Sequence, residues 1–438
     1  MNKKFIFVLM LLGFMSLAMS QQNSKDRIHS LPGLGKLNHL EFAGYLPLAS
    51  KIRGKPGGNL FYWYVENLEQ QKNAPLVLWL NGGPGAASMY GFLMENGPYS
   101  VNPDLSLKKR ADSWTQKADY LIIDQPAGVG LSYGEQDSYA NEDEAMDQLY
   151  HALNQFFTRY PHLKKKAFYL AGESYAGKYL PQLAMRIITG NKNNKTPIHL
   201  KGLMIGDAWV NPKVQQAANI DYAYYHGLID EQDRPFVMKL YKDCVQEIDK
   251  QKPSSKKANR VCMKIQNFIQ QQSGQLNLAN IAKGVEPDDQ HMIAYLNKPE
   301  VRSALHVDPR VKKFTTFSEV VADKLELGEQ DSVAELYPEL LKAGIKILLY
   351  NGLEDGKDSN FLSTQRWLSQ LNWTYKNEFK EASRCVWFIS NKKVAGYAKA
   401  SHGLTLVTIR NAGHLAPIDQ PEALLDLFHH FIENKTLC

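Results

Sequence analysis

Two short segments carry the side-chain types that nucleophilic catalysis uses. Ser174 lies in the stretch FYLAGESYAG (168–177), where small residues flank the serine between an apolar run and a helical pattern. A serine hydroxyl is a weak nucleophile unless a base takes its proton, and imidazole suits that task because it titrates near neutral pH. His414 lies in NAGHLAP (411–417), just after a β-rich run, and is the candidate base. Either segment alone would more often be an ordinary turn.

A carboxylate completes this set. Asp355 follows the apolar run 346–350, and an acid placed there could hold the imidazole tautomer and stabilise the imidazolium. Glu354 is the competing candidate, one residue earlier. The chain order Ser174, Asp355, His414 is the order of α/β hydrolases, whose serine stands on a sharp strand-to-helix turn. The strict motif has glycine where Ala176 stands, and alanine is small enough to keep that turn.

A glycine-rich segment could supply electrostatic stabilisation. The stretch WLNGGPG (79–85) follows another apolar run, and its adjacent glycines let backbone N–H groups approach a ligand closely. Acyl transfer needs donors aimed at the developing oxyanion. We assign one donor to the N–H of Gly83 and the other to the N–H of Tyr175, directly after the candidate nucleophile. Without the serine segment, an ordinary glycine turn would be the better interpretation.

Alternating elements must position these groups. Helical spacing occurs over 142–160, 175–188 and 421–432, between several continuously apolar runs that predict strands. This alternation predicts an α/β fold with a mostly parallel central sheet and helices on both faces. Ligands bind at the carboxyl ends of the strands in such sheets, which is where all the candidate groups fall. The predicted strands are 60–65, 75–80, 120–124, 167–171, 200–206, 345–350 and 404–409.

One region interrupts this alternation. From about residue 211 to residue 336 the strand runs vanish and polar, helical sequence takes over. We interpret 211–336 as a helical cap inserted into a core built from 21–210 and 337–438. A separate helical domain is the weaker alternative, because the strand pattern resumes at Lys346. Caps of this kind commonly shape the substrate entrance.

The first twenty residues have the pattern of a signal peptide. Lys3 and Lys4 precede a short apolar run, and Ala18 and Ser20 place small residues at a cleavage site. An N-terminal anchor is the minority alternative, and no later segment is apolar enough for a membrane helix. We therefore expect the secretory route, with the protein secreted or held in a lysosome or vacuole, and no membrane association after cleavage. The net charge of +6 includes Lys3 and Lys4, and the +4 that remains without them is too slight to indicate nucleic acid as a partner.

The cysteines and glycan motifs fit an oxidising route. Cys244 and Cys262 flank a polar, lysine-rich stretch and are the predicted disulfide pair, whereas Cys385 and Cys438 could pair or stay free. The sequence has no C-x-x-C and no H-E-x-x-H, so we expect no metal, and nothing in it requires a cofactor. Three glycan acceptor motifs, conditional on secretion and exposure, begin at Asn194, Asn372 and Asn434.

These segments together resemble the serine carboxypeptidase family, of the carboxypeptidase Y and cathepsin A type. The resemblance runs from about residue 40 to residue 431. It rests on 81–85, on DQPAGVGLSY (124–133), on 172–177, on LMIG (203–206), on 350–355 and on 412–417. It implies an α/β-hydrolase fold with a helical insertion. It also implies that peptide or protein C-termini are the substrate and that residues are released from them.

The resemblance further implies how the substrate's free carboxylate is held. Asn81 and Glu173 match the family positions that bind it. A glutamate facing a carboxylate would repel it if both were ionised, so one of them must carry a proton. We therefore expect an acidic pH optimum, with peptidase activity falling as Glu173 loses its proton. The alternative for Glu173 is a turn residue paired to a nearby base.

Several positions depart from the family pattern. Ala86 and Ala87 replace a usual Cys-Ser, Asp207 stands where asparagine is usual, and Leu415 replaces a common methionine. None of these changes removes a member of the candidate triad. An acyltransferase that uses the same triad, or a non-catalytic secreted binding protein on the same fold, stays open as an alternative. The sequence leaves the oligomeric state open as well.

Overall fold

A ten-stranded mixed sheet forms the centre of the molecule. The computed structural model describes residues 25–48, 57–71, 73–134, 138–192 and 195–437. The strands follow one another across the sheet in this order: β12 (Cys385–Ile389), β13 (Lys393–Ser401), β14 (Leu404–Ile409), β11 (Lys346–Gly352), β10 (Leu200–Gly206), β9 (Phe168–Glu173), β5 (Leu76–Leu80), β8 (Asp119–Ile123), β4 (Asn59–Val65) and β3 (Glu41–Pro47).

The middle of the sheet is parallel and buried. Strands β14, β11, β10, β9, β5 and β8 pair in parallel, and antiparallel strands extend the sheet at both edges. Strands β5 and β8 are buried at every residue, as expected for strands covered on both faces. Each strand predicted from an apolar run is present within one or two residues, which confirms the predicted mostly parallel sheet.

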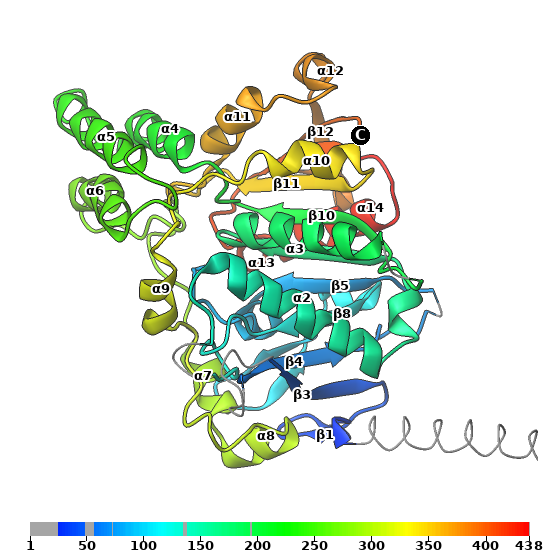
Figure 1. The fold of residues 1–438 in the computed structure, drawn as a ribbon. Helices are drawn as coiled ribbons and strands as arrows, with labels where there is room; N and C mark the ends of the chain where they lie inside the picture. Colours follow the sequence, from blue (N-terminus) through cyan, green and yellow to red (C-terminus); the bar gives the residue numbers. More distant parts are fainter. Residues whose placement is uncertain (1–24, 49–56, 72, 135–137, 193–194, 438) are drawn as a thin grey trace, which may run out of the picture.

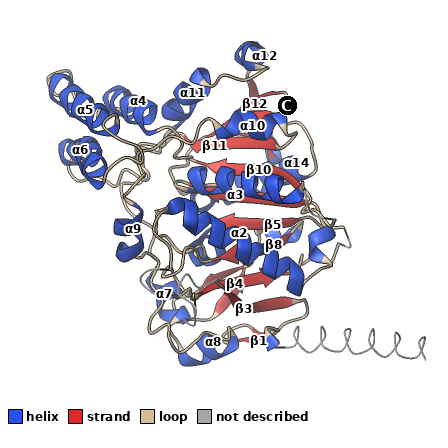
Figure 2. Ribbon diagram, in the orientation of Figure 1, coloured by secondary structure: helices blue, strands red, loops and turns tan. Residues whose placement is uncertain are grey.

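Helices cover both faces of the sheet. On one face lie α2 (Glu142–Arg159), α3 (Ala176–Asn191) and α10 (Leu336–Lys342), in front of the strands in Figure 1. Behind the sheet lies α14 (Pro421–Ile432), as the colouring of Figure 2 makes clear. The ring of Phe428 on α14 stacks on Trp114, with 4.1 Å between the ring centroids. This three-layer arrangement is the α/β-hydrolase fold that the sequence predicted.

Between residues 211 and 336, all the regular elements that the structure describes are helices. They are α4 (Pro212–Tyr225), α5 (Arg234–Ile248), α6 (Lys256–Gln272), α7 (Gln290–Leu296), α8 (Pro299–Ala304) and α9 (Glu319–Leu325). Helices α4, α5 and α6 stand apart from the sheet, beyond the carboxyl ends of β10 and β11 (Figure 1). They share an apolar core of their own, which includes Ile220, Val237 and Ile265. The exact boundaries of a cap domain stay a prediction.

Smaller elements complete the chain. Helices α11 (Phe361–Gln370), α12 (Lys376–Glu381) and α13 (Ala416–Asp419) follow β11 and β14, and a short π-helical turn covers Gly91–Glu95. Two small hairpins pair Ser30–Leu31 with Gly35–Lys36 and Tyr99–Val101 with Leu107–Lys109. Within the described ranges, none of the helices has both the length and the apolar character needed to cross a bilayer.

Candidate active site

Ser174 occupies the turn between β9 and α3. Its φ of +60° lies in the left-handed region, which non-glycine residues rarely adopt. Its amide donates to the Gly206 carbonyl at 2.9 Å, and its own carbonyl accepts from Trp209 N–H at 3.0 Å. The side chain is partly exposed, although its neighbours on both sides are buried. A serine held in a strained, well-anchored turn at a strand end matches the predicted nucleophile elbow.

The small residues around Ser174 are required by close packing. A Cβ on Gly172 would lie 2.2 Å from the Leu80 carbonyl oxygen and 2.8 Å from the Ala176 Cβ. A Cβ on Gly177 would lie 2.7 Å from the Trp209 carbonyl oxygen. Both contacts involve groups that cannot rotate away. The alanine at position 176 keeps this turn because its single methyl group fits against the glycine.

The side chains of His414 and Asp355 are in contact. The Nδ1 atom of His414 lies 2.9 Å from the Oδ2 atom of Asp355, and both side chains are buried. The other oxygen of Asp355 accepts from the Lys357 amide at 2.8 Å. This arrangement orients the imidazole so that Nε2 is the free ring nitrogen. Glu354, the competing acid, lies outside this pair, and its backbone amide bonds the Ala412 carbonyl.

The hydrogen bonds of His414 in the described part of the chain run to Asp355 and to a backbone carbonyl, and none joins the ring to Ser174 Oγ. Strands β9, β11 and β14 run parallel, so all three residues stand at the same edge of the sheet. Catalytic hydrogen bonds in free enzymes are often long and tighten only when substrate binds.

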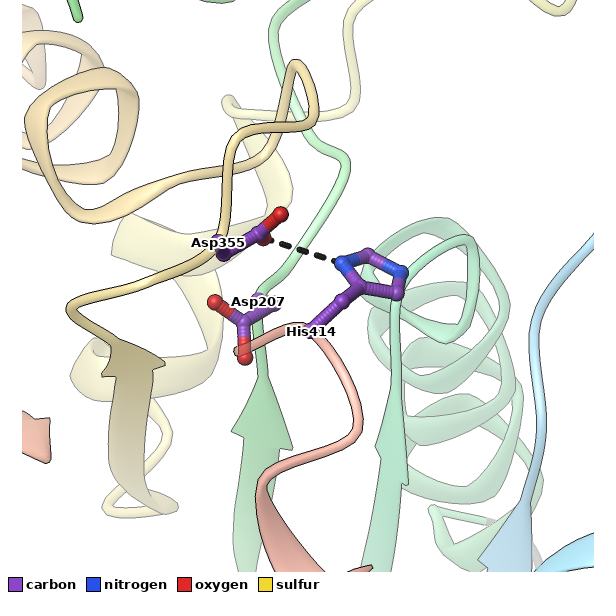
Figure 3. A group of neighbouring side chains, drawn as sticks. All are labelled: Asp207, Asp355 and His414. Atoms are coloured by element: carbon purple, nitrogen blue, oxygen red, sulfur yellow. Dashed lines mark hydrogen bonds and ion pairs between the residues drawn. The ribbon is translucent and has the colours of Figure 1, made fainter. Parts of the chain in front are cut away.

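A third carboxyl group lies beside this pair. Asp207 follows β10 and is fully buried. One polar side-chain atom from each of Asp207, Asp355 and His414 lies within 4.8 Å of such an atom in the other two (Figure 3). Asn351 Nδ2 donates to its Oδ1 at 3.1 Å. Such a group could also surround a cation. The hydrogen bond between His414 Nδ1 and Asp355 already accounts for the closest contact, and the expectation of no metal stays a prediction.

The glycine segment lies against the nucleophile turn. A Cβ on Gly82 would lie 2.4 Å from the Tyr175 backbone nitrogen, so the two backbones are in direct contact. Gly83 has φ +109°. Among the described residues, the amides of Gly83 and Tyr175 donate no hydrogen bond within the chain. Two unsatisfied donors beside Ser174 fit an oxyanion site.

Asn81 and Glu173 are hydrogen-bonded to each other, and a third residue joins them. Asn81 Nδ2 donates to Glu173 Oε1 at 3.0 Å and to Glu95 Oε1 at 2.8 Å. Its Oδ1 accepts from Trp79 Nε1 at 2.8 Å and from the Gly91 amide at 3.0 Å, so the orientation of the amide is fixed. All three polar side chains are buried.

The two glutamates of this network favour a shared proton. Burial raises the pKa of Glu95, and the pKa of Glu173 is raised by burial first and then by the charge of Glu95. Neither Oε2 atom accepts a hydrogen bond from a protein donor of the described residues. A proton held on Glu173 supplies the missing donor between the two carboxyl groups. Glu173 therefore stays neutral at pH values where an exposed glutamate is charged.

Comparison with known proteins identifies the family. A model of the family described as serine carboxypeptidase matches residues 32–434. The chain belongs to the serine carboxypeptidase family. Probable serine carboxypeptidase CPVL of Homo sapiens is 35% identical over 414 residues, which cover 91% of this chain and 84% of that relative. Venom serine carboxypeptidase of Apis mellifera is 37% identical over 405 residues, with 90% and 84% covered.

A solved structure supports the same assignment. The structure of Kex1(delta)p, a prohormone-processing carboxypeptidase from Saccharomyces cerevisiae, matches with a TM-score of 0.83 and 26% identity. The match covers 94% of this chain and 96% of that one. Together with the family match, this shows a serine-type carboxypeptidase on an α/β-hydrolase fold, so the predicted family and enzyme class are confirmed.

Sequence reasoning missed Glu95 in this carboxypeptidase. A lone acid inside the otherwise apolar stretch MYGFLMENG (89–97) was the available signal, because a charged residue is seldom fully buried without a partner. The stretch forms the π-helical turn Gly91–Glu95, whose last residue points its carboxyl at Asn81.

The remaining predicted sites concern disulfides, glycan acceptors and the signal peptide. Cys244 on α5 and Cys262 on α6 form a disulfide, with 4.6 Å between their Cα atoms. Cys385 is also disulfide-bonded, and Cys438 lies outside the described residues. Asn372 and Asn434 are exposed, whereas Asn194 and the predicted signal peptide lie outside the described residues.

Proposed function

We propose that this carboxypeptidase removes C-terminal residues from peptides through an acyl-enzyme on Ser174. The observation that carries the proposal is the 2.9 Å contact between His414 Nδ1 and Asp355, at the sheet edge where the Ser174 turn stands. His414 Nε2 takes the proton of the Ser174 hydroxyl as Oγ attacks the scissile carbonyl. Asp355 keeps the ring in the tautomer that exposes Nε2 and stabilises the imidazolium that forms.

The oxyanion of the tetrahedral intermediate lies against the amides of Gly83 and Tyr175. Both donors lack a partner among the described residues, so they are available for a charge that appears only during reaction. His414 then gives its proton to the leaving amine, which departs as the released amino acid. A water molecule, activated by the same imidazole, hydrolyses the ester on Ser174 and restores the enzyme.

Recognition of the free C-terminus falls to Asn81 and Glu173. In the free enzyme Asn81 Nδ2 donates to Glu95 and to Glu173, so a bound substrate carboxylate takes over the hydrogen bond that Glu173 accepts. Neutral Glu173 then turns its hydroxyl from Glu95 to the substrate and bonds the carboxylate without repelling it. Because the pKa of Glu173 is raised, the neutral form persists at acidic pH and is lost as pH rises through that value. This supports an acidic optimum for peptide cleavage.

A matched pair of peptides tests this function. One peptide carries a free C-terminal carboxylate and the other an amide, and products are read by mass at several pH values. We expect single residues to leave the free peptide, far slower cleavage of the amidated one, and neither reaction with Ser174→Ala. Internal cleavage, or transfer of the acyl group to an added alcohol in preference to water, would overturn the proposal.

We also propose that the protein follows the secretory route to the exterior, a lysosome or a vacuole. The Cys244–Cys262 disulfide supports an oxidising compartment, and Asn372 and Asn434 are exposed as glycan acceptors must be. Expression in a eukaryotic host with N-terminal mass analysis tests this route. We expect a mature N-terminus near Gln21 and a mass shift on deglycosylation that the variants Asn372→Gln and Asn434→Gln reduce. An intact N-terminus on intracellular protein would contradict it.

A further inference from the structure

Two buried carboxyl groups lie beside one histidine at the catalytic edge of the sheet. Asp207 and Asp355 are both fully buried, and His414 is the only imidazole, lysine or arginine side chain of the described residues that pairs with either. Two adjacent carboxylates cannot both ionise cheaply inside a protein, so one of them holds a proton. The side-chain partners decide which one.

The contacts of Asp355 suit an anion. Its Oδ2 faces His414 Nδ1 at 2.9 Å, and its Oδ1 accepts from the Lys357 amide at 2.8 Å. Asp207 has weaker donors, because Asn351 Nδ2 lies at 3.1 Å and the Gly352 amide at 3.4 Å. The negative charge is therefore better stabilised on Asp355, and the proton is better placed on Asp207.

We propose that Asp207 is a positioning residue that keeps a proton and donates it in a hydrogen bond to Asp355. That bond fixes the carboxylate which in turn holds His414, without Asp207 touching the substrate. The two carboxyl groups stand side by side beyond the ends of β10 and β11, which are neighbours in the sheet (Figure 3). The inference rests on the proposed triad and adds a fourth member behind it.

The electrostatic surroundings agree with this placement. Burial first, and then the charge of Asp355, raise the pKa of Asp207. Among the described residues, the other titratable groups that interact with Asp207 include His414 from the loop after β14, Glu173 from β9, Tyr350 from β11 and Tyr222 from α4. Asp358, whose pKa is raised by burial, interacts with Asp355 and His414. Glu173 and the tyrosines are neutral where the enzyme works, so they do not draw the proton away.

A pH limit follows from the bond. Below its raised pKa, Asp207 keeps its proton and Asp355 stays oriented. As pH rises through that value the bond is lost, and a second negative charge appears beside Asp355 and His414. Repulsion between the two carboxylates then moves Asp355 out of the orientation in which it holds the His414 ring. Catalysis therefore falls on the alkaline side through Asp207, independently of Glu173.

The test uses a blocked ester substrate, which has no free carboxylate and so leaves Glu173 uninvolved. Wild type, Asp207→Asn and Asp207→Ala are compared by kcat across pH. Asparagine keeps a donor toward Asp355, cannot ionise, and tolerates the φ of +42° at this position. In Asp207→Asn we expect the midpoint of the alkaline loss of kcat to rise by about one pH unit or more. We expect kcat of Asp207→Ala to lie roughly tenfold below that of Asp207→Asn.

A second measurement needs no turnover. The proton between His414 Nδ1 and Asp355 gives a far-downfield NMR signal, assigned by its loss in His414→Gln. In wild type this signal should shift with the same midpoint as the alkaline loss of ester cleavage, and in Asp207→Asn it should not. An unchanged alkaline midpoint in Asp207→Asn, or a wild-type signal that is flat across that range, would overturn the inference. Failure of the proposed function would instead appear as wild type that cleaves neither ester nor peptide while the signal still titrates.

Discussion

The backbone amide of His414 donates a 2.6 Å hydrogen bond to the carbonyl oxygen of Ala279, which belongs to the helical insertion. The same short stretch also reaches the Asp355 loop, because Gly356 N–H bonds the Leu278 carbonyl and Ile281 N–H bonds the Glu354 carbonyl. The insertion thus holds the loops of the base and the acid in place together. This stretch of the insertion is therefore part of the catalytic framework.

Gly413 is where this contact is most sensitive. A Cβ at that position would lie 2.1 Å from the Ala279 carbonyl oxygen, and both groups are backbone. We expect Gly413→Ala to displace the His414 loop and to lower the free energy of unfolding by about 1–3 kcal/mol. We also expect kcat to fall by a larger factor than the factor by which KM changes. Thermal unfolding and steady-state kinetics measure the two effects.

Gly403→Ala is the matched control, since the nearest atom to its Cβ would be 3.8 Å away. Its φ of +86° carries its own strain, so we expect the stability of the control variant to fall while its kcat is unchanged. Equal kcat losses in both variants would contradict this.

Glu173 sets the pH dependence of peptide binding. In Glu173→Gln the side chain is neutral at every pH and can still donate a hydrogen bond. We expect KM for a free C-terminal peptide to rise with pH in wild type and to become flat in the variant, because only the wild-type group ionises. If the variant keeps the wild-type slope of KM against pH, another group controls recognition.

Glu95 affects the pH at which Glu173 loses its proton. Its charge is one of the causes that raise the pKa of Glu173, so a neutral residue there lets Glu173 ionise earlier. Glu95→Gln should therefore lose peptide cleavage at a lower pH than wild type, while cleavage of a blocked ester keeps its own pH profile. The pH dependence of kcat/KM with the two substrates provides the measurement. An unmoved or raised midpoint for the peptide would show that the two carboxyl groups do not share a proton.

The disulfide between α5 and α6 stabilises the helical insertion. It closes a loop with a sequence separation of 18, for which chain entropy gives about 3 kcal/mol. We expect the double variant Cys244→Ala, Cys262→Ala to unfold at lower denaturant concentration, with the loss detected first in hydrogen exchange of α5 and α6. Exchange that rises equally across the central sheet would contradict a local role.

The parallel centre of the sheet was predictable because it is buried on both faces. Strands β5, β8 and β11 appear in the sequence as continuous apolar runs, and the candidate triad follows from the short segments after such runs. Strands β3, β12 and β13 were not predicted, and the edge strand β12 shows one reason. Val386 and Phe388 on it are exposed, so its sequence lacks the alternation that marks a half-buried strand.

The contacts that support the site were harder to foresee. Leu278 and Ala279 act through backbone carbonyls, which any residue could supply, so their sequence carries no signal. In the sequence, Asp207 was noted only as an aspartate where asparagine is usual after a predicted strand. Its place beside Asp355 depends on the register of β10 against β11, which pairs Gly206 with Tyr350. Sequence reasoning found side chains with chemistry and missed the groups that hold them.

The most direct test of the account is the site of covalent labelling by a fluorophosphonate. The protein is labelled at acidic and neutral pH, digested, and mapped by mass spectrometry, with Ser174→Ala treated in parallel. The account predicts a single adduct on Ser174, lost in the variant and strongly slowed in His414→Gln. An adduct on another serine, or no adduct on folded wild-type protein, would contradict it.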